Sequence, residues 1–333
     1  MKTAVIGSGS WGSAMALLLA GKGYDVYLWS WQQEETDRLI RDRENKEFLP
    51  GCKFPDNIIC SHDMSLCTDG AELIITAVPS PATRTTARQL SACTACGQRI
   101  LNISKGLEAG TLLRLSQVYA QEIPQADVSV MSGPSHAEEV SRALPTTNVV
   151  ASSSPETALW IQETIMTDVF RIYTSDDIIG VELGGALKNV IALCAGISDG
   201  IGYGDNTKAA LMTRGLAEIK RLGIAMGAKP ETFAGLSGVG DLIVTCTSMH
   251  SRNRRAGILL GRGKSLEETL SEVHMVVEGV NTASAAYELS KKYGVSMPIT
   301  EEACNILYNG KTPLDAVYAL MTRDKKPELE AEK

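Results

Sequence analysis

The sequence of 333 residues predicts an α/β fold in two parts, a doubly wound sheet over residues 1–175 and an all-helical domain over residues 176–323. Two observations predict this division. Short apolar strand patterns alternate with helical patterns up to about residue 175, as in a parallel sheet covered by helices. Beyond that point the strand patterns stop and helical patterns continue. The charged stretch 324–333 is expected to be a disordered tail.

Composition and charge exclude several classes of function. The net charge is −7, and the only dense basic cluster, Arg252 with Arg254 and Arg255, is too short for a nucleic-acid footprint. Apolar runs such as 190–197 fall short of the roughly 20 residues that a membrane span needs. The N-terminus enters a glycine-rich turn and does not resemble a signal peptide. We therefore expect a cytoplasmic protein with no nucleic-acid partner and no membrane span.

The cysteines and histidines do not predict a metal site. The eight cysteines are scattered, and in a reducing cytosol free thiols are expected. Cys93 and Cys96 form one CxxC pair, but no second pair or HxxxH partner completes a zinc site. A structural or redox role for this pair stays open as a minor alternative.

The sheet and its covering helices are predicted in alternation along the first half. Strands are expected at Thr3–Ile6, Asp25–Trp29, Asn57–Cys60, Glu72–Val78, Arg99–Ile103, Val128–Met131, Thr147–Ala151 and Val169–Tyr173. Helices are expected at Ser13–Ala20, Glu34–Arg43, Pro81–Ala95, Thr111–Gln121, Ser135–Arg142 and Pro155–Met166. Such alternation favours a parallel sheet whose ligands lie beyond the carboxyl ends of its strands.

The second half is predicted to be helical throughout. Its helices are expected at Ile178–Ser198, Thr207–Met226, Glu231–Leu236, Gly240–Thr247, Arg252–Leu260, Ser265–Val273, Thr282–Tyr293, Ile299–Tyr308 and Thr312–Met321.

The first strand leads into a dinucleotide-binding turn. Gly7, Gly9 and Gly12 form a GxGxxG motif between a strand and a helix, where glycines permit a tight turn and close approach to a pyrophosphate. Free N–H groups at the start of the helix favour the negative charge of the pyrophosphate. The sequence therefore predicts a Rossmann-like first domain that binds NAD or NADP. After the second strand, Ser30–Glu34 carries neither the acid typical of NAD sites nor the arginine typical of NADP sites, so the choice stays open.

Three polar segments leave strand ends in this half: Ala77–Ser80, Ser104–Gly106 and Ser132–Ala137. Lys105 directly follows a strand. It could meet a phosphate, polarise a carbonyl or point into solvent, and taken alone solvation is the favoured interpretation.

A single lysine interrupts a nearly apolar helix in the second half. At helical spacing Lys188 shares a face with Gly184, Gly185, Ala192 and Ala195, and we expect nothing large to cover that face. A lysine above a shelf of small residues loses its charge more easily than in water and can act as an acid or base near neutral pH. The alternative is that Lys188 extends its amine to solvent.

Two further clusters carry polar chemistry. Asp241 and Thr245 lie at i and i+4, so they share a helix face, and a carboxylate there could set the charge state of a lysine. The alternative is that Asp241 simply caps a helix in a glycine-rich turn. Ser251, Arg252 and Asn253 place a guanidinium at a helix start, which makes a compact phosphate site. The alternative is a solvated basic face.

Together these motifs resemble one family. GSGSWG at 7–12, SKG at 104–106, SGPSHAEEV at 132–140, GVELGGALKNVIAL at 180–193, GVGDLIVTCTS at 238–248, SRNRRAG at 251–257 and VVEGV at 276–280 are similar to the bacterial NAD(P)-dependent sn-glycerol-3-phosphate dehydrogenases. The resemblance covers Lys2 to about Met321. It implies an oxidoreductase that interconverts dihydroxyacetone phosphate and glycerol 3-phosphate for phospholipid synthesis.

The resemblance also implies roles for single residues. Lys188 matches the proton donor and acceptor, helped by Lys105, Asp241 and Thr245. Positions matching substrate contacts are Lys105, Gly133, Ser135, Lys188, Asn189, Asp241, Ser251, Arg252 and Asn253. Positions matching cofactor contacts are Gly7, Gly9, Ser10, Trp11, Gly12, Trp31, Lys105, Ala137, Arg252, Val276 and Glu278. Family members often carry His or Arg at positions 31–32, and their absence here weakens the expected preference for NADPH.

Two other interpretations stay open. Dehydrogenases of the β-hydroxyacid and 6-phosphogluconate type share the two-domain layout and a catalytic lysine on the first helix after the sheet. A dinucleotide-sensing module without catalysis is the second. The SRN cluster and GVGDL favour a small phosphorylated triose, and the presence of every expected polar residue argues against a sensor. The sequence does not reveal an oligomeric state, and a homodimer is the assembly to test.

Overall fold

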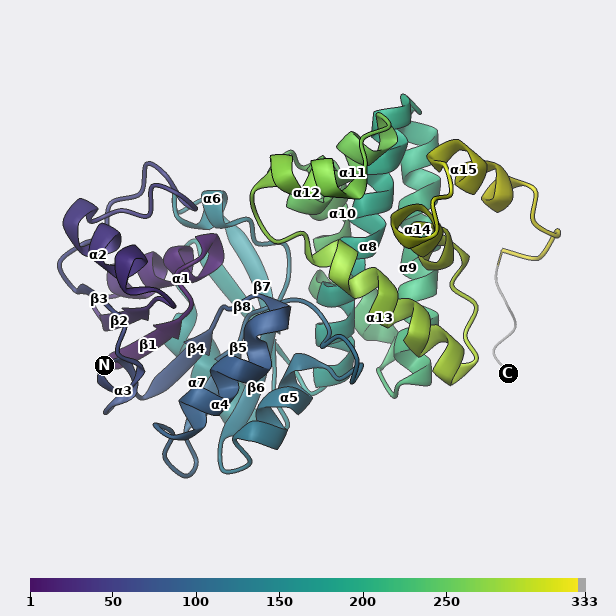
Figure 1. Cartoon of the computed structure of the whole chain (residues 1–333). Coiled ribbons are helices and arrows are strands. Elements are labelled where there is room, and N and C mark those ends of the chain that lie inside the picture. Colours follow the sequence, from purple (N-terminus) through teal and green to yellow (C-terminus); the bar gives the residue numbers. More distant parts are fainter. Residues whose placement is uncertain (329–333) are drawn as a thin grey trace.

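The computed structural model describes residues 1–328, and the end of the expected tail, 329–333, lies outside the described residues. A sheet covered by helices forms one side of the molecule and a group of helices forms the other (Figure 1). The α/β fold class is therefore confirmed. The last strand ends at Ser175 and the next helix begins at Ile178, whereas the division into domains at 175/176 stays a prediction.

All eight predicted strands are present and form one sheet of order β3-β2-β1-β4-β5-β6-β7-β8. Their bounds are β1 Lys2–Ile6, β2 Asp25–Trp29, β3 Ile58–Ser61, β4 Leu73–Thr76, β5 Arg99–Asn102, β6 Asp127–Ser132, β7 Thr146–Ala151 and β8 Phe170–Ser175. The chain builds outward from β1 to β3 and then restarts at β4 on the other side of β1. The strand order thus reverses between β1 and β4, which is where open α/β sheets bind ligands.

The expectation of a parallel sheet is wrong at one junction, because β6 and β7 are antiparallel. Only α6 (Ala137–Val140) lies between them, and its 4 residues extend about 6 Å. A parallel return would have to cross the length of a strand of 6 residues, about 20 Å. The connection therefore turns back at the carboxyl end of β6, and β8 continues parallel to β7.

Alternate strand residues face two separate apolar layers. Val5 and Ile75 pack on one face with α1, α2 and α7, whereas Ile6 and Ile74 pack on the other face with α3, α4 and α5. The helices are α1 Ser10–Gly21, α2 Gln33–Asp42, α3 Met64–Thr68, α4 Thr83–Ser91, α5 Leu115–Glu122 and α7 Pro155–Ile165, with a 3-10 turn η1 Ser80–Ala82 before α4. The short helix α3 was not predicted, because five residues are too few to show a helical period.

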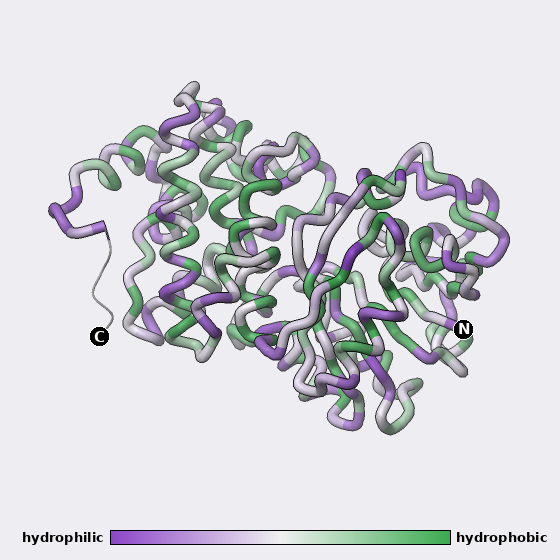
Figure 2. Tube along the Cα trace, turned by 180° about the vertical axis from the view of Figure 1, so that it is seen from behind, coloured by the Kyte–Doolittle hydropathy of each residue, from purple (hydrophilic) through white to green (hydrophobic). Residues whose placement is uncertain are grey.

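The helical half is arranged around α8 (Ile178–Ile201), which packs against α9, α10, α11 and α13. The other elements are α9 Asp205–Ala225, η2 Pro230–Ala234, η3 Leu236–Gly240, α10 Asp241–Thr247, α11 Arg252–Gly261, α12 Leu266–Val273, α13 Glu278–Tyr293, α14 Pro298–Tyr308 and α15 Pro313–Met321. Figure 2 shows hydrophobic colour along the strands and the central helices, with hydrophilic colour on the outer loops. The predicted helices of this half are thus present, and η3 adds one π-helical turn directly before α10.

By length and hydropathy, α8 alone among the described helices could cross a membrane, which differs from the expectation that no apolar run is long enough. Its 24 residues include glycines and alanines that extend the apolar run beyond 190–197. However, 89% of its most apolar window is buried inside the protein. We therefore interpret α8 as the core helix of this half.

Candidate active site

The turn after β1 can hold a pyrophosphate. Gly7 has a φ of +113°, and a Cβ at Gly12 would lie 1.8 Å from the carbonyl oxygen of Gly7, so both positions require glycine for the fold itself. A Cβ at Gly9, in contrast, would meet no protein atom within 4 Å. Gly9 is also the N-cap of α1 and offers no side-chain cap to the free N–H groups of the helix start. This cradle fits the phosphates of a dinucleotide.

The turn lies at the reversal of strand order. Gly7 follows β1, and a Cβ there would lie 2.7 Å from the carbonyl oxygen of Ala77, which follows β4. Ser10 and Trp11 form the first turn of α1. Ala137 is buried at the start of α6, which packs beside α1. The structure therefore places four cofactor positions predicted from the sequence at one edge of the sheet.

A buried cluster of charges lies where the helical half meets the sheet. Lys188, in the middle of α8, donates to Asp241 Oδ1 and, at 2.6 Å, to Thr245 Oγ1. Asp241 and Thr245 begin and end one turn of α10, as their spacing predicts, and Thr245 also donates to the carbonyl of Asp241. Asp241 is fully buried and Lys188 is 6% exposed. Lys188 therefore does not extend to solvent.

Lys105 brings the sheet half to the same carboxylate. It follows β5 and donates to Asp241 Oδ2 at 2.7 Å and to the carbonyl of Gly133 at 3.0 Å. Ser132, the last residue of β6, also donates to Asp241 Oδ2 at 3.4 Å. One carboxylate thus joins two lysines from opposite halves of the molecule, and Lys105 is not simply solvated.

Burial and charge set the proton affinities of this cluster. Burial lowers the pKa of Lys188 to about 7, although the adjacent Asp241 favours the charged amine. Burial alone would raise the pKa of Asp241, but the ammonium groups of Lys105 and Lys188 outweigh it and hold that pKa below its usual range. The pair can therefore keep an ionised carboxylate beside an amine that exchanges its proton near neutral pH.

The expected open shelf beside Lys188 is wrong in part. A Cβ at Gly184 would lie 2.4 Å from the carbonyl oxygen of Ser237, and one at Gly185 would lie 2.4 Å from Ser132 Oγ. These glycines let the π-turn η3 and the end of β6 approach α8 closely. They serve packing that places Asp241 and Ser132 near Lys188, and they do not leave space for a substrate.

A second polar network continues along α8. Asn253 Nδ2 donates to Asn189 Oδ1 at 2.9 Å, and Gly279 N donates to Asn253 Oδ1 at 2.8 Å. These bonds join α8, α11 and the start of α13. Ser251 caps α11, where its Oγ accepts from the N–H of Arg254.

Arg252 in the first turn of α11 is an unusual cation. Burial lowers its pKa, and Glu278 and Glu138 are the carboxylates that act on its charge. No hydrogen bond or ion pair within 4 Å joins its guanidinium to another residue in the range 1–328. A partly buried guanidinium at a helix start, without a direct partner, can receive a phosphate.

Glu278 connects the two halves at another strand end. Its carboxylate accepts from Ser80 N at 3.0 Å and from Ser80 Oγ at 2.6 Å, at the start of η1 in the loop that follows β4. A Cβ at Gly106 would lie 2.6 Å from that serine, so the loop after Lys105 is also held here. Burial raises the pKa of Glu278. Ser80 and Ser132 belong to the polar segments predicted at strand ends, Ala77–Ser80 and Ser132–Ala137, but neither is predicted individually as a site residue.

Trp31, Val276 and Ser135 are among the expected site positions that make no bond to Lys188, Lys105 or Asp241. Trp31 is 53% exposed beyond β2, with its ring edge on Trp29, and Val276 is 38% exposed. Ser135 Oγ donates to the Gly133 carbonyl, the same oxygen that Lys105 contacts. The hollow beside Trp31 is lined in part by Glu34 and Asp63.

No group of three or more His, Cys, Asp or Glu residues is arranged to hold a metal ion within residues 1–328. The eight cysteines are free.

Comparison with known proteins gives consistent matches along the chain. The family model described as NAD-dependent glycerol-3-phosphate dehydrogenase N-terminus matches residues 2–158, and the model of the C-terminus matches residues 177–318. The chain is 56% identical to glycerol-3-phosphate dehydrogenase (NAD(P)+) of Moorella thermoacetica over 98% of each chain. It is 54% identical to that of Geobacillus kaustophilus over 98% of this chain and 96% of the relative. The crystal structure of glycerol-3-phosphate dehydrogenase from Coxiella burnetii superposes with a TM-score of 0.94 at 38% identity, covering 97% and 99% of the two chains.

Proposed function

The chain belongs to the NAD-dependent glycerol-3-phosphate dehydrogenase family, and from this premise we propose that it reduces dihydroxyacetone phosphate to sn-glycerol 3-phosphate with NAD(P)H, reversibly. The observation that carries the proposal is the buried cluster of Lys188, Asp241 and Lys105 at the strand ends of a dinucleotide-binding sheet. It supplies proton transfer and positive charge beside the place where a dinucleotide fits. Both are needed to reduce a carbonyl.

Lys188 is the proposed acid and base. Negative charge develops on the C2 oxygen during reduction, and a protonated Lys188 gives its proton to that oxygen. Asp241 and Thr245 hold the amine in place, since both accept its hydrogen bonds. Lys105 adds fixed positive charge on the opposite side of the carboxylate.

The phosphate end of the substrate is assigned to the start of α11. Arg252 offers a guanidinium with no direct partner among the described residues, and Ser251 and Asn253 flank it. The bonds of Asn253 to Asn189 and Gly279 fix this helix start against α8 and α13. The distance between phosphate and carbonyl is thereby set by the packing of α11 on α8. Gly133 and Ser135 are proposed to line the substrate at the end of β6.

The cofactor is assigned to the strand ends of the sheet half. Gly7, Gly9, Gly12, Ser10 and Trp11 would hold its pyrophosphate, and the cofactor supplies the hydride when bound. The further contacts proposed are Trp31, Lys105, Ala137, Arg252, Val276 and Glu278. Carboxylates of Glu34 and Asp63 near the end of β2 would repel a 2′-phosphate, so we expect NADH to be used at least as well as NADPH.

The cellular setting follows the family. We propose a cytoplasmic enzyme whose product supplies the backbone for phospholipid synthesis. A homodimer is proposed as the assembly.

A spectrophotometric assay tests the proposed function. Oxidation of NADH or NADPH should occur with dihydroxyacetone phosphate and be far slower with unphosphorylated dihydroxyacetone. No oxidation with the phosphorylated triose, together with activity on a β-hydroxyacid or 6-phosphogluconate in the reverse direction, would assign the chain to the other dehydrogenase type. Dinucleotide binding without any turnover would instead make it a sensor.

A further inference from the structure

One buried histidine beside the lysine cluster has a ring nitrogen without a partner. His136 lies in the polar segment that follows β6, directly before α6. Its Nε2 is buried, and no residue in the described range 1–328 forms a hydrogen bond to it. Buried polar atoms in folded proteins are nearly always paired, with protein, water or a ligand. The missing partner of this nitrogen therefore needs an explanation.

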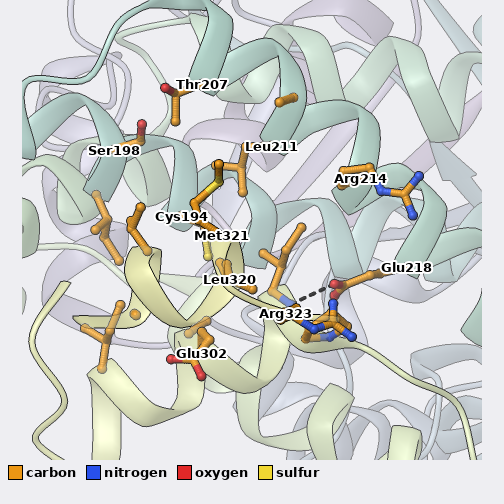
Figure 3. A pocket seen from close by; sticks show the side chains of 18 of the residues that line it. Cys194, Ser198, Thr207, Leu211, Arg214, Glu218, Glu302, Leu320, Met321 and Arg323 are labelled. Atoms are coloured by element: carbon orange, nitrogen blue, oxygen red, sulfur yellow. Dashed lines mark hydrogen bonds between the residues drawn. The ribbon is translucent and has the colours of Figure 1, made fainter. Parts of the chain in front are cut away.

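An ionisable group that is buried elsewhere in the helical half shows the contrast. Glu218 lines an apolar cavity between α8, α9, α14 and α15 (Figure 3). Its carboxylate accepts from Ile299 N at 2.7 Å and from Thr300 N at 3.2 Å, so the protein itself satisfies this group. Among the described residues, none does the same for His136 Nε2. The fold thus pairs one buried group and leaves the other available.

His136 adjoins both ends of the proposed substrate site. Gly133, three residues earlier in the chain, accepts from Lys105 in the lysine cluster. The ring of His136 packs against that of His250, with 5.7 Å between the ring centroids. His250 directly precedes Ser251, the cap of α11 at the proposed phosphate site. A ligand that reaches from the lysine cluster to the start of α11 therefore lies close to His136.

The surroundings of His136 favour a neutral ring. Burial lowers its pKa, and the positive charges of Lys188 and Lys105 act in the same direction. Glu138 and the backbone of Val244 favour the charged ring but are outweighed. A neutral imidazole has one N–H and one lone pair, and a hydroxyl can pair with either because it both donates and accepts. A phosphate only accepts and is better paired with a permanent cation, so this ring is suited to a hydroxyl group.

One polar group of the proposed substrate has no assigned partner. The phosphate of dihydroxyacetone phosphate is assigned to Arg252, and its C2 oxygen to Lys188. We propose that the C1 hydroxyl binds to His136 Nε2, and that this hydrogen bond makes the site specific for a ketone with a hydroxymethyl group. The proposal rests on the proposed reaction, since it requires this substrate. His136 is then a specificity-determining residue and not the acid or base.

A substrate without this hydroxyl tests the contact. In hydroxyacetone phosphate a methyl group replaces the hydroxymethyl group, so Nε2 stays buried and unpaired when the analogue binds. The wild-type kcat/KM should therefore be at least about tenfold higher with dihydroxyacetone phosphate than with hydroxyacetone phosphate. Oxidation of NADH with each ketone measures this ratio, which we call the hydroxyl preference.

His136→Phe keeps an aromatic ring and removes both ring nitrogens. This variant should lower the hydroxyl preference about tenfold, by reducing kcat/KM for dihydroxyacetone phosphate. Its kcat/KM for hydroxyacetone phosphate should change by less than about threefold, because the methyl group makes no bond to the ring. A residue that served only packing would affect both ketones alike.

Two amide variants identify the nitrogen that makes the contact. His136→Gln places an amide near the position of Nε2, whereas His136→Asn reaches only the position of Nδ1. The glutamine variant should keep most of the hydroxyl preference, and the asparagine variant should lose it. His274→Asn makes the same change at an exposed histidine and should keep the wild-type preference as the control.

Turnover of hydroxyacetone phosphate shows that each variant folds. A wild-type hydroxyl preference in both His136→Phe and His136→Asn would overturn the proposal, and so would an equal loss of activity on both ketones. If His136→Phe does not fold, equal preferences in the two amide variants would overturn it. A wild-type enzyme that reduces neither ketone would contradict the proposed reaction itself, which is a separate failure.

Discussion

Gly9 in the turn after β1 and the glycines Gly184 and Gly185 in the middle of α8 have opposite surroundings. A side chain at Gly9 would meet no protein atom, whereas one at Gly184 or Gly185 would collide with Ser237 or Ser132. The position of Gly9 is open, as the proposed pyrophosphate site requires, whereas Gly7 and Gly12 beside it are packed. The middle of α8 is filled by protein, and its close packing brings Asp241 to Lys188. A glycine in a sequence motif therefore indicates a ligand site or close packing only when its surroundings in the structure are known.

The largest effect is expected from Lys188 in the packed region, whose loss should greatly lower turnover but not cofactor binding at the turn after β1. Lys188→Ala should lower kcat by about 10³-fold, the usual scale of a lost acid–base group, and leave cofactor affinity unchanged. Steady-state kinetics with fluorescence titration of NADH measures both. Lys264→Ala, which changes an exposed lysine paired with Glu272, is the control. Near-normal reduction by Lys188→Ala would contradict the proposed role of the packed region.

Arg252 is the proposed phosphate contact of the helical half, so its replacement tests whether this half also binds the substrate. Arg252→Ala should raise KM for dihydroxyacetone phosphate about 100-fold with a smaller change in kcat, since a charged hydrogen bond to phosphate is lost. Activity on unphosphorylated dihydroxyacetone should change little. The exposed Arg262 supplies a matched control, Arg262→Ala. An unchanged KM would exclude α11 as the phosphate site.

Gly184→Ala tests the packed region itself. Its Cβ would displace η3, so the free energy of unfolding should fall by about 2 kcal/mol, as for an overpacked core. Because Asp241 follows η3 directly, kcat should fall with little change in cofactor affinity. Urea denaturation and kinetics measure the two effects. Wild-type stability would show that the helices can separate at no cost.

Gly9→Ala is the matched change in the open region and has the smallest effect. Its φ of −64° suits alanine, so stability should stay the same. Affinity for NADH should fall about tenfold because the added methyl group occupies the approach of the pyrophosphate. If Gly9→Ala lowered stability and Gly184→Ala lowered only the affinity for NADH, the proposed difference between the two regions would be wrong.

Local patterns in the sequence predicted most of the fold, whereas the resemblance to the family predicted that Lys188, Lys105, Asp241 and Thr245 lie in one site. The GxGxxG spacing, the alternation of strands and helices, and the i, i+4 spacing of Asp241 and Thr245 are properties of short segments. The antiparallel β7, the π-turn η3 and the contacts of Ser132 depend on residues far apart in the chain. The neighbours of Gly184 and Gly185 cannot be predicted for the same reason, since small residues on a helix face are compatible both with free space and with close packing of protein.

Burial also determines the pKa of Lys188, which the sequence alone does not predict. Its pKa of about 7 in the folded protein lies below the 10.5 of an exposed lysine. Between these values the unfolded chain binds more protons than the native one, so this group makes stability rise with pH, by up to about 1.4 kcal/mol per unit. The protonated form needed for reduction is therefore about half populated at pH 7 and predominates at lower pH.

The most direct test of Lys188 as the acid–base group is the pH dependence of kcat/KM, measured with dihydroxyacetone phosphate for reduction and with glycerol 3-phosphate for oxidation. Reduction should decline as the pH rises through about 7, and oxidation of glycerol 3-phosphate should increase over the same range, because one needs Lys188 protonated and the other needs it neutral. Both transitions should disappear from the residual activity of Lys188→Ala. Profiles without a transition near pH 7, or the same profiles in that variant, would contradict Lys188 as the acid–base group.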